Sequence, residues 1–145
     1  MKKFIILLIA ITATVFVTSC DSDDDNVAPA SLEGTWKTTA ETEGGVAVSL
    51  TACELEETAT FTSATATFYD YDDNSNPCTY ETITYPYTRT GDNITITVTQ
   101  GQTTFTVTAA VEVLNATTLR VRTISDSQGG VYTGSDAEST TYARQ

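Results

Sequence analysis

Apolar and polar residues alternate one by one along most of the chain after residue 31, and threonine fills many of the polar positions. The clearest case is residues 93–99, where Ile94, Ile96 and Val98 fall on one side of an extended chain and threonines on the other. A period of two predicts a half-buried β-strand, and threonine, valine, isoleucine and tyrosine favour that conformation. Because no convincing helical period accompanies it, the pattern predicts an all-β domain.

Turn residues separate the alternating runs and predict how the strands connect. Gly91 precedes the strand at 93–99, Gly101 follows it, and Asn115 divides the next two runs. Pro86 has no backbone donor and therefore predicts an edge or a bulge. Short connections predict sequential antiparallel neighbours, and closing this meander into an up-and-down barrel removes its edges. We expect a small eight-stranded antiparallel barrel with strands near 34–41, 57–62, 65–71, 78–88, 93–99, 103–113, 117–124 and 138–144, with a further short run at 46–51.

The first residues have the layout of a secretory signal, with Lys2 and Lys3 before an uncharged apolar stretch. That stretch is shorter than the roughly 20 residues needed to span a bilayer. Residues 17–20, Val-Thr-Ser-Cys, resemble the lipobox of bacterial lipoproteins. The resemblance implies cleavage before Cys20 and acyl chains, such as palmitate, on its thiol and new amino group, which anchor the protein to a membrane. An ordinary secretory signal with a coincidental cysteine is the alternative.

These features divide the chain into a signal peptide at 1–19, an acylated cysteine with an acidic linker at 20–30, and a barrel domain at 31–145. The run from Asp21 to Asn26 is a solvated linker by composition. It also resembles the acidic export signal that some Gram-negative lipoproteins carry after the acylated cysteine. That resemblance implies a location on the outer membrane, facing the cell exterior.

The chain is strongly acidic, with a net charge of −12. Such a charge repels phosphate backbones, so we expect no nucleic-acid partner. Of the three cysteines, Cys20 is assigned to the lipid, which leaves Cys53 and Cys78. An exported context is oxidising, and an even remainder of two predicts a disulfide. A metal pair is the alternative, but the chain has no histidine and no third thiol nearby.

The domain resembles the lipocalins and, more closely, the lipocalin-like lipoproteins of Gram-negative bacteria. Gly34 to Trp36 matches the Gly-x-Trp that opens the first lipocalin strand, within a Leu-x-Gly-Thr-Trp-Lys segment that begins at Leu32. Arg144 lies in a Tyr-x-Arg-like end. The resemblance implies a barrel in which Arg144 packs on Trp36 to close one end, and a cation–π contact of this kind contributes about 0.5 to 2 kcal/mol. No Thr-Asp-x-Tyr-like motif occurs in the later strands.

No residue pattern specifies a reaction, so we expect no enzyme and no cofactor. The chain has no histidine, no Gly-x-Ser-x-Gly and no phosphate-binding loop. Glu54, Glu56 and Glu57 form a carboxylate patch, and paired carboxylates can hydrolyse glycosides. The simpler interpretation of this patch is a solvated acidic loop.

The segment from Asp70 onward is similar to a calcium-binding loop, with oxygen-bearing side chains at Asp70, Asp72, Asn74 and Glu81. Ser75 stands where such loops need glycine, and strands rather than helices flank the segment. We therefore favour an acidic hairpin tip beside the disulfide, with no metal.

The family resemblance implies non-catalytic binding of a small apolar or amphiphilic molecule, or of a glycan, inside the barrel. A set of tyrosines is expected either to line the opening or to pair across the outer wall: Tyr69, Tyr71, Tyr80, Tyr85 and Tyr87. Eight strands can also fill a small barrel with their own side chains. The alternative function is therefore an interaction or structural module at the cell surface with a filled core.

Overall fold

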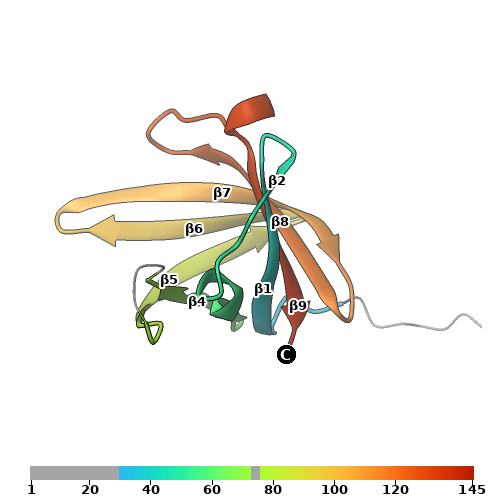
Figure 1. Cartoon of the computed structure of the whole chain (residues 1–145). Coiled ribbons are helices and arrows are strands. Elements are labelled where there is room, and N and C mark those ends of the chain that lie inside the picture. Colours follow the sequence, from blue (N-terminus) through green and yellow to red (C-terminus); the bar gives the residue numbers. More distant parts are fainter. Residues whose placement is uncertain (1–29, 73–75) are drawn as a thin grey trace, which may run out of the picture.

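A computed structural model describes residues 30–72 and 76–145, and these form a β-barrel with two short 3₁₀ helices (Figure 1). The predicted all-β, eight-stranded antiparallel barrel is confirmed, and each predicted strand is present within about three residues of its expected ends. The elements are β1 (Gly34–Glu43), β2 (Val46–Val48), η1 (Glu54–Glu56), β3 (Thr58–Phe61), β4 (Thr65–Tyr71), β5 (Tyr80–Thr90), β6 (Asn93–Gln100), β7 (Thr103–Leu114), β8 (Thr118–Asp126), η2 (Gly134–Asp136) and β9 (Glu138–Arg144).

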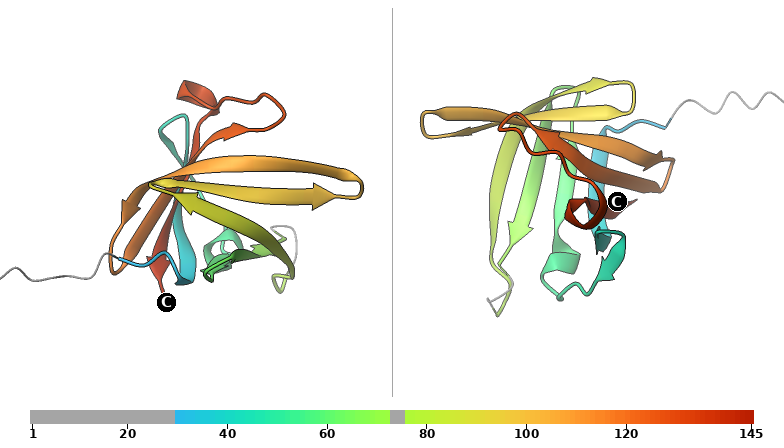
Figure 2. Two further views of the ribbon diagram at one scale, coloured as in Figure 1. Left: turned by 180° about the vertical axis from the view of Figure 1, so that it is seen from behind. Right: turned by 90° about the horizontal axis from the view of Figure 1, so that it is seen from above.

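Each long strand pairs with its neighbour in the sequence, and β9 returns to pair with β1, which closes the barrel. The short β2 is an extension that pairs only with the far end of β1, at Glu41 to Glu43. The first described residues and the C-terminus lie side by side at one end of the barrel, beside the start of β1 (Figures 1 and 2). A backbone hydrogen bond from Gln145 to Thr35 joins them there.

The hydrophobic core fills this end, which we call the closed end. Trp36, Ile94 and Leu119 are its largest fully buried side chains. They pack with four smaller or more peripheral buried residues: Leu32, Ala59, Phe61 and Ala66. Alternate residues of each strand face the core, as the period of two requires.

Threonines occupy much of the outer wall, and they pair across neighbouring strands. Hydroxyl groups lie within hydrogen-bond distance in four such pairs: Thr35 with Thr60, Thr67 with Thr84, Thr95 with Thr108, and Thr99 with Thr104. Cross-strand pairs of this kind stabilise a sheet by a few tenths of a kcal/mol to about 1 kcal/mol each. The high threonine content therefore belongs to the solvent face of the barrel.

The opposite end of the barrel is incompletely paired, and we call it the open end. β5 pairs with β6 only over Tyr87–Thr90, whereas β5 pairs with β4 over Tyr80–Pro86. Pro86 lies where the β5–β6 pairing stops, as its missing donor predicted for an edge. The β6–β7 hairpin continues past this point and projects beyond the other strands (Figure 1).

Several predictions concern residues outside the described part of the chain. These are the signal peptide at 1–19, acylation of Cys20, the acidic signal from Asp21 to Asn26, and Asn74 of the calcium interpretation. Within residues 30–72 and 76–145, no helix has the length and apolar character needed to cross a membrane.

Candidate functional site: a cavity at the open end of the barrel

The closed end brings together the two residues that the family resemblance singled out. The Arg144 guanidinium carbon lies 4.5 Å from the centre of the Trp36 ring, and Arg144 also donates a hydrogen bond to the carbonyl of Ser31. The Trp36 indole N–H donates to the Leu32 carbonyl at 2.8 Å. Gly34 has a φ of 135°, and a Cβ there would lie 2.9 Å from the Arg144 side chain. Glycine is therefore required for this closure.

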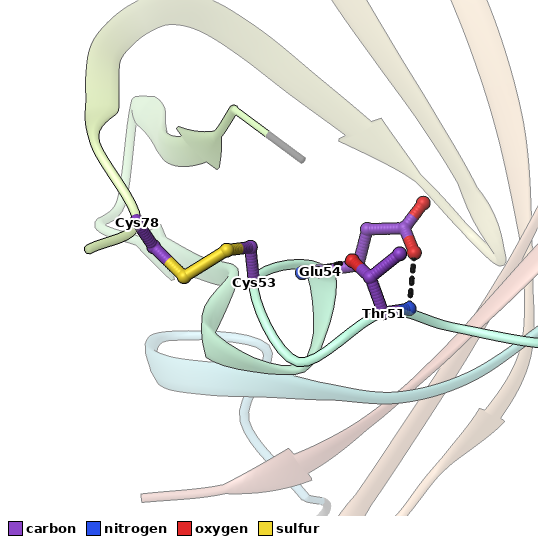
Figure 3. Close-up of a disulfide and its surroundings, with 4 residues drawn as sticks. All are labelled: Thr51, Cys53, Glu54 and Cys78. Atoms are coloured by element: carbon purple, nitrogen blue, oxygen red, sulfur yellow. Dashed lines mark hydrogen bonds between the residues drawn. A yellow bond between two sulfur atoms is a disulfide. The ribbon is translucent and has the colours of Figure 1, made fainter. Parts of the chain in front are cut away.

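At the other end, the predicted disulfide between Cys53 and Cys78 is confirmed (Figure 3). It links η1 to the chain entering β5 across a sequence separation of 25 residues. Thr51 and Glu54 fix the start of η1 reciprocally. The Thr51 hydroxyl accepts from the Glu54 N–H, and the Glu54 carboxylate accepts from the Thr51 N–H. The end of η1 then directs the next residue, Glu57, into β3.

A cavity of about 310 Å³ lies at the open end, lined by residues from five strands of the barrel and by Glu57. Most of its lining residues occupy positions that face the interior. Its apolar wall consists of Phe68 on β4 and Ile83 and Tyr85 on β5. The Phe68 and Tyr85 rings are tilted against each other, with centroids 6.3 Å apart. The volume is at the lower end of the roughly 300–1,000 Å³ typical of small-molecule sites.

The polar wall of the cavity consists of Thr38, Glu57, Asp70 and Tyr142. Thr38 is only 3 % exposed. Burial raises the pKa of the Tyr142 hydroxyl to about 12, so it is neutral and can donate or accept a hydrogen bond. The cavity therefore combines aromatic surface with carboxylates and hydroxyls.

A β-bulge in β1 adds a further carboxylate beside the cavity. The pairing of β1 with β9 shifts register between Thr38 and Ala40. Thr38 faces the interior before the bulge, and Glu41 takes an inward position after it. The Thr140 hydroxyl donates to the Glu41 carboxylate at 3.4 Å. Burial raises the pKa of Glu41, and the charge of Glu54 raises it further.

Glu57 is the most perturbed carboxyl group of the cavity. Partial removal from water raises its pKa to about 7, and the negative charges of Asp70 and Glu41 act in the same direction. A hydrogen bond from the Tyr71 backbone N–H opposes this rise. The interpretation of Glu54, Glu56 and Glu57 as one solvated loop is therefore wrong for Glu57, because η1 ends before it and directs it inward.

The five tyrosines divide between the two faces of the wall. Tyr85 lines the cavity, and Tyr87 packs against the core with its ring centroid 5.6 Å from that of Phe61. Tyr69, Tyr71 and Tyr80 form a cluster at outward positions, with the ring centroids of Tyr69 and Tyr71 5.8 and 5.1 Å from that of Tyr80, and Tyr69 also borders the cavity. Both expectations thus hold in part, and Tyr69 meets both of them.

Of the four residues in the calcium interpretation, the structure describes Asp70, Asp72 and Glu81, and Asn74 lies outside the described residues. Asp70 and Glu81 are directly opposite each other in the β4–β5 pair, on the inward face. Among the described residues, no group of three or more His, Cys, Asp and Glu side chains is arranged to hold a metal ion. A second hollow of about 450 Å³ at this hairpin tip is lined by Asp70, Tyr71, Asp72, Thr79, Tyr80 and Glu81 alone. It has walls from one hairpin, whereas the open-end cavity has walls from five strands.

Thr38, Glu41 and Tyr142 were not singled out from the sequence as site residues. The inward position of Tyr142 could have been inferred, because it lies two residues before Arg144 and alternate residues of a strand share a face. Glu41 had none, because the bulge that turns it inward leaves no mark in the alternation.

A family model described as a lipocalin-like domain matches residues 32–121. A crystal structure of an uncharacterized protein from Bacteroides eggerthii DSM 20697 is also similar, with a TM-score of 0.51 and 14 % sequence identity. That similarity covers 79 % of this chain and 100 % of the other, and at such identity it concerns the fold alone. No curated protein matches the chain.

Proposed function

Since this chain belongs to the lipocalin-like domain family, we propose that it binds a small apolar or amphiphilic molecule, without catalysis, in the cavity at the open end. The single observation that carries this proposal is the cavity of about 310 Å³, with Phe68, Ile83 and Tyr85 on one wall and hydroxyl and carboxyl groups on the other. Apolar sites with a few convergent polar groups are typical of small-molecule binding. The alternative, a module with a filled core, fits the closed end only.

We further propose that the protein is a lipoprotein held to the outer membrane, facing the cell exterior, by acyl chains on Cys20. The sequence of residues 17–20 and the acidic run after Cys20 support this location. The barrel domain begins at the closed end, which suits an anchor on the N-terminal side. Leu32 and Ser31 contact Trp36 and Arg144 at the closed end, so an anchor on this side leaves the mouth of the cavity free.

Fluorescence of N-phenyl-1-naphthylamine, a neutral apolar probe, tests the binding proposal. We expect the wild-type domain to enhance its emission and Ile83→Trp to abolish the enhancement, because the larger ring fills the cavity. Thr82→Trp is the matched control, since Thr82 is exposed on the opposite face of β5. Equal enhancement by Ile83→Trp and the wild type would place the probe elsewhere and would contradict the proposal.

Metabolic labelling with radioactive palmitate in a Gram-negative host tests the anchor. We expect label in the wild type and none in Cys20→Ala, which should also leave the membrane fraction.

Replacing Asp23, Asp24 and Asp25 with alanine tests whether the acidic run directs the protein to the cell surface. In intact cells, we expect added protease to digest the wild type and to leave the triple alanine variant intact. Equal digestion of the two proteins would overturn the proposed surface location.

A further inference from the structure

The charged residues of the barrel are distributed unequally between its two ends. Glu57 and Asp70 line the cavity, and Glu41 lies directly beside it. No lysine or arginine lines it: of those in the described part of the chain, Lys37 pairs with Glu56, Arg120 and Arg122 contact Glu112, Arg89 bonds to the Gly91 carbonyl, and Arg144 stacks on Trp36. The carboxylates of the cavity therefore have no basic side chain as a counter-ion within it.

The Thr38 hydroxyl adds an uncharged hydrogen-bonding group to the wall of this cavity. Thr38 is 97 % buried, its side chain faces the interior, and it contributes to the cavity wall. A hydroxyl group can donate or accept a hydrogen bond, so Thr38 can meet a polar part of a ligand.

From these observations we propose that the cavity selects small organic cations, an ammonium group joined to an aromatic or aliphatic body, over neutral molecules and anions of the same size. This inference rests on the proposed function, because it names the ligand class of the same cavity. The carboxylates of Glu57 and Asp70 provide the attraction, which the partial burial of Glu57 strengthens. The Thr38 hydroxyl accepts a hydrogen bond from the ammonium group.

The aromatic wall accounts for the organic part of the ligand. The rings of Phe68 and Tyr85 offer apolar surface for its body, and their faces attract a cation. A cavity of about 310 Å³ has room for a ring and a short chain as well as the charged group. The raised pKa of Glu57 is consistent with this ligand, since partial burial and the nearby negative charges of Asp70 and Glu41 both oppose its ionisation.

Isothermal titration calorimetry with three matched probes tests the proposal: 2-phenylethylammonium, 2-phenylethanol and 3-phenylpropanoate at pH 7.5 and low salt. The probes share one ring and a similar chain, and they differ in charge. We expect the ammonium probe to bind about tenfold more tightly than the alcohol, and the carboxylate to bind most weakly.

The double variant Glu57→Gln, Asp70→Asn should lower the affinity for the ammonium probe about tenfold and leave that for the alcohol nearly unchanged. The matched control, Glu33→Gln with Asp92→Asn, removes the same charge at exposed positions outside the cavity and should keep the preference. If thermal unfolding shows the double cavity variant to be unfolded, each single variant serves instead, with a loss of about threefold expected.

The outcomes separate the two proposals. If the alcohol or the carboxylate binds as tightly as the ammonium probe, and Ile83→Trp abolishes that binding, selection for cations is overturned while the proposed function stands. If none of the three probes binds and N-phenyl-1-naphthylamine shows no dependence on Ile83, both proposals fail.

Discussion

At the closed end of the barrel, Trp36, Ile94 and Leu119 are fully buried, and the nearest charged group, Arg144, stacks on the Trp36 ring. At the open end, Glu57, Asp70 and hydroxyl groups surround a cavity instead. The strands are continuous between the two ends. What differs is the choice of inward-facing residue and the loss of pairing between β5 and β6.

This difference indicates that the closed end of the barrel stabilises the fold and that the open end binds the ligand. A filled core can hold the fold while the other end retains partly buried charge that destabilises it locally. Energetically unfavourable groups of this kind are typical of functional sites. The comparison predicts that substitutions at the closed end act mainly on stability, and substitutions at the open end act mainly on binding.

The largest effect is expected at Trp36. Trp36→Ala removes a fully buried ring and leaves a cavity, which should lower the free energy of unfolding by about 3 to 5 kcal/mol. Tyr85→Ala, at a half-buried position of the open end, should cost clearly less. Urea denaturation measures both, and equal losses would contradict the division between the ends.

The disulfide is the main covalent support of the open end. Replacing Cys53 and Cys78 with serine should lower the free energy of unfolding by about 3 kcal/mol, because the unfolded chain gains the freedom of a 25-residue separation. It should also weaken binding of the ammonium probe, since η1 positions Glu57 at the cavity. Full probe binding by the folded variant would show that η1 holds its place without the covalent link.

The pH dependence of stability reports on Glu57. Its pKa is about 7 in the folded protein and 4.5 as a free side chain, so the folded state binds the proton more tightly. The stabilisation is complete below pH 4.5 and is lost as the pH rises through 7. Because Glu57 is only partly buried, solvent screening limits the expected loss to about 1 kcal/mol. Asp70 and Glu41 are the charged groups that face it.

Glu57→Gln should remove this decline and be the more stable protein at pH 8, as thermal unfolding from pH 4.5 to 8 can measure. The variant Glu33→Gln, at an exposed position of the closed end, should keep the wild-type profile. An unchanged profile in Glu57→Gln would mean that the decline has another source.

The smallest effect is expected at Arg144. Arg144→Lys keeps the charge but loses the planar group over Trp36, and it should lower the free energy of unfolding by about 0.5 to 1 kcal/mol. Affinity for the neutral probe at the open end should not change. A loss of binding without a loss of stability would reverse the roles assigned to the two ends.

The strands could be predicted from the sequence because their alternation is regular. Ile94, Ile96 and Val98 mark the core face of β6, and the glycines at 91 and 101 mark its turns. The pairing of Cys53 with Cys78 followed from the count of cysteines. The strands follow from the local sequence pattern and the disulfide from the number of cysteines, so both can be predicted without the three-dimensional arrangement.

The cavity could not be predicted in the same way. Glu41 faces inward only because a bulge shifts the register after Thr38, and a shift of one residue exchanges the two faces of a strand. Glu57 faces inward only because η1 ends just before it. Whether the interior is filled depends on how side chains from five strands meet, and the alternation within any one strand does not specify this.

Native mass spectrometry of the protein from its own host tests the central claim, that the open end is a binding site, most directly. We expect the wild type and Thr82→Trp to carry a small-molecule mass that is absent from Ile83→Trp, the variant with the filled cavity. A mass retained equally by Ile83→Trp would contradict the claim, because the bound molecule would then lie outside the cavity.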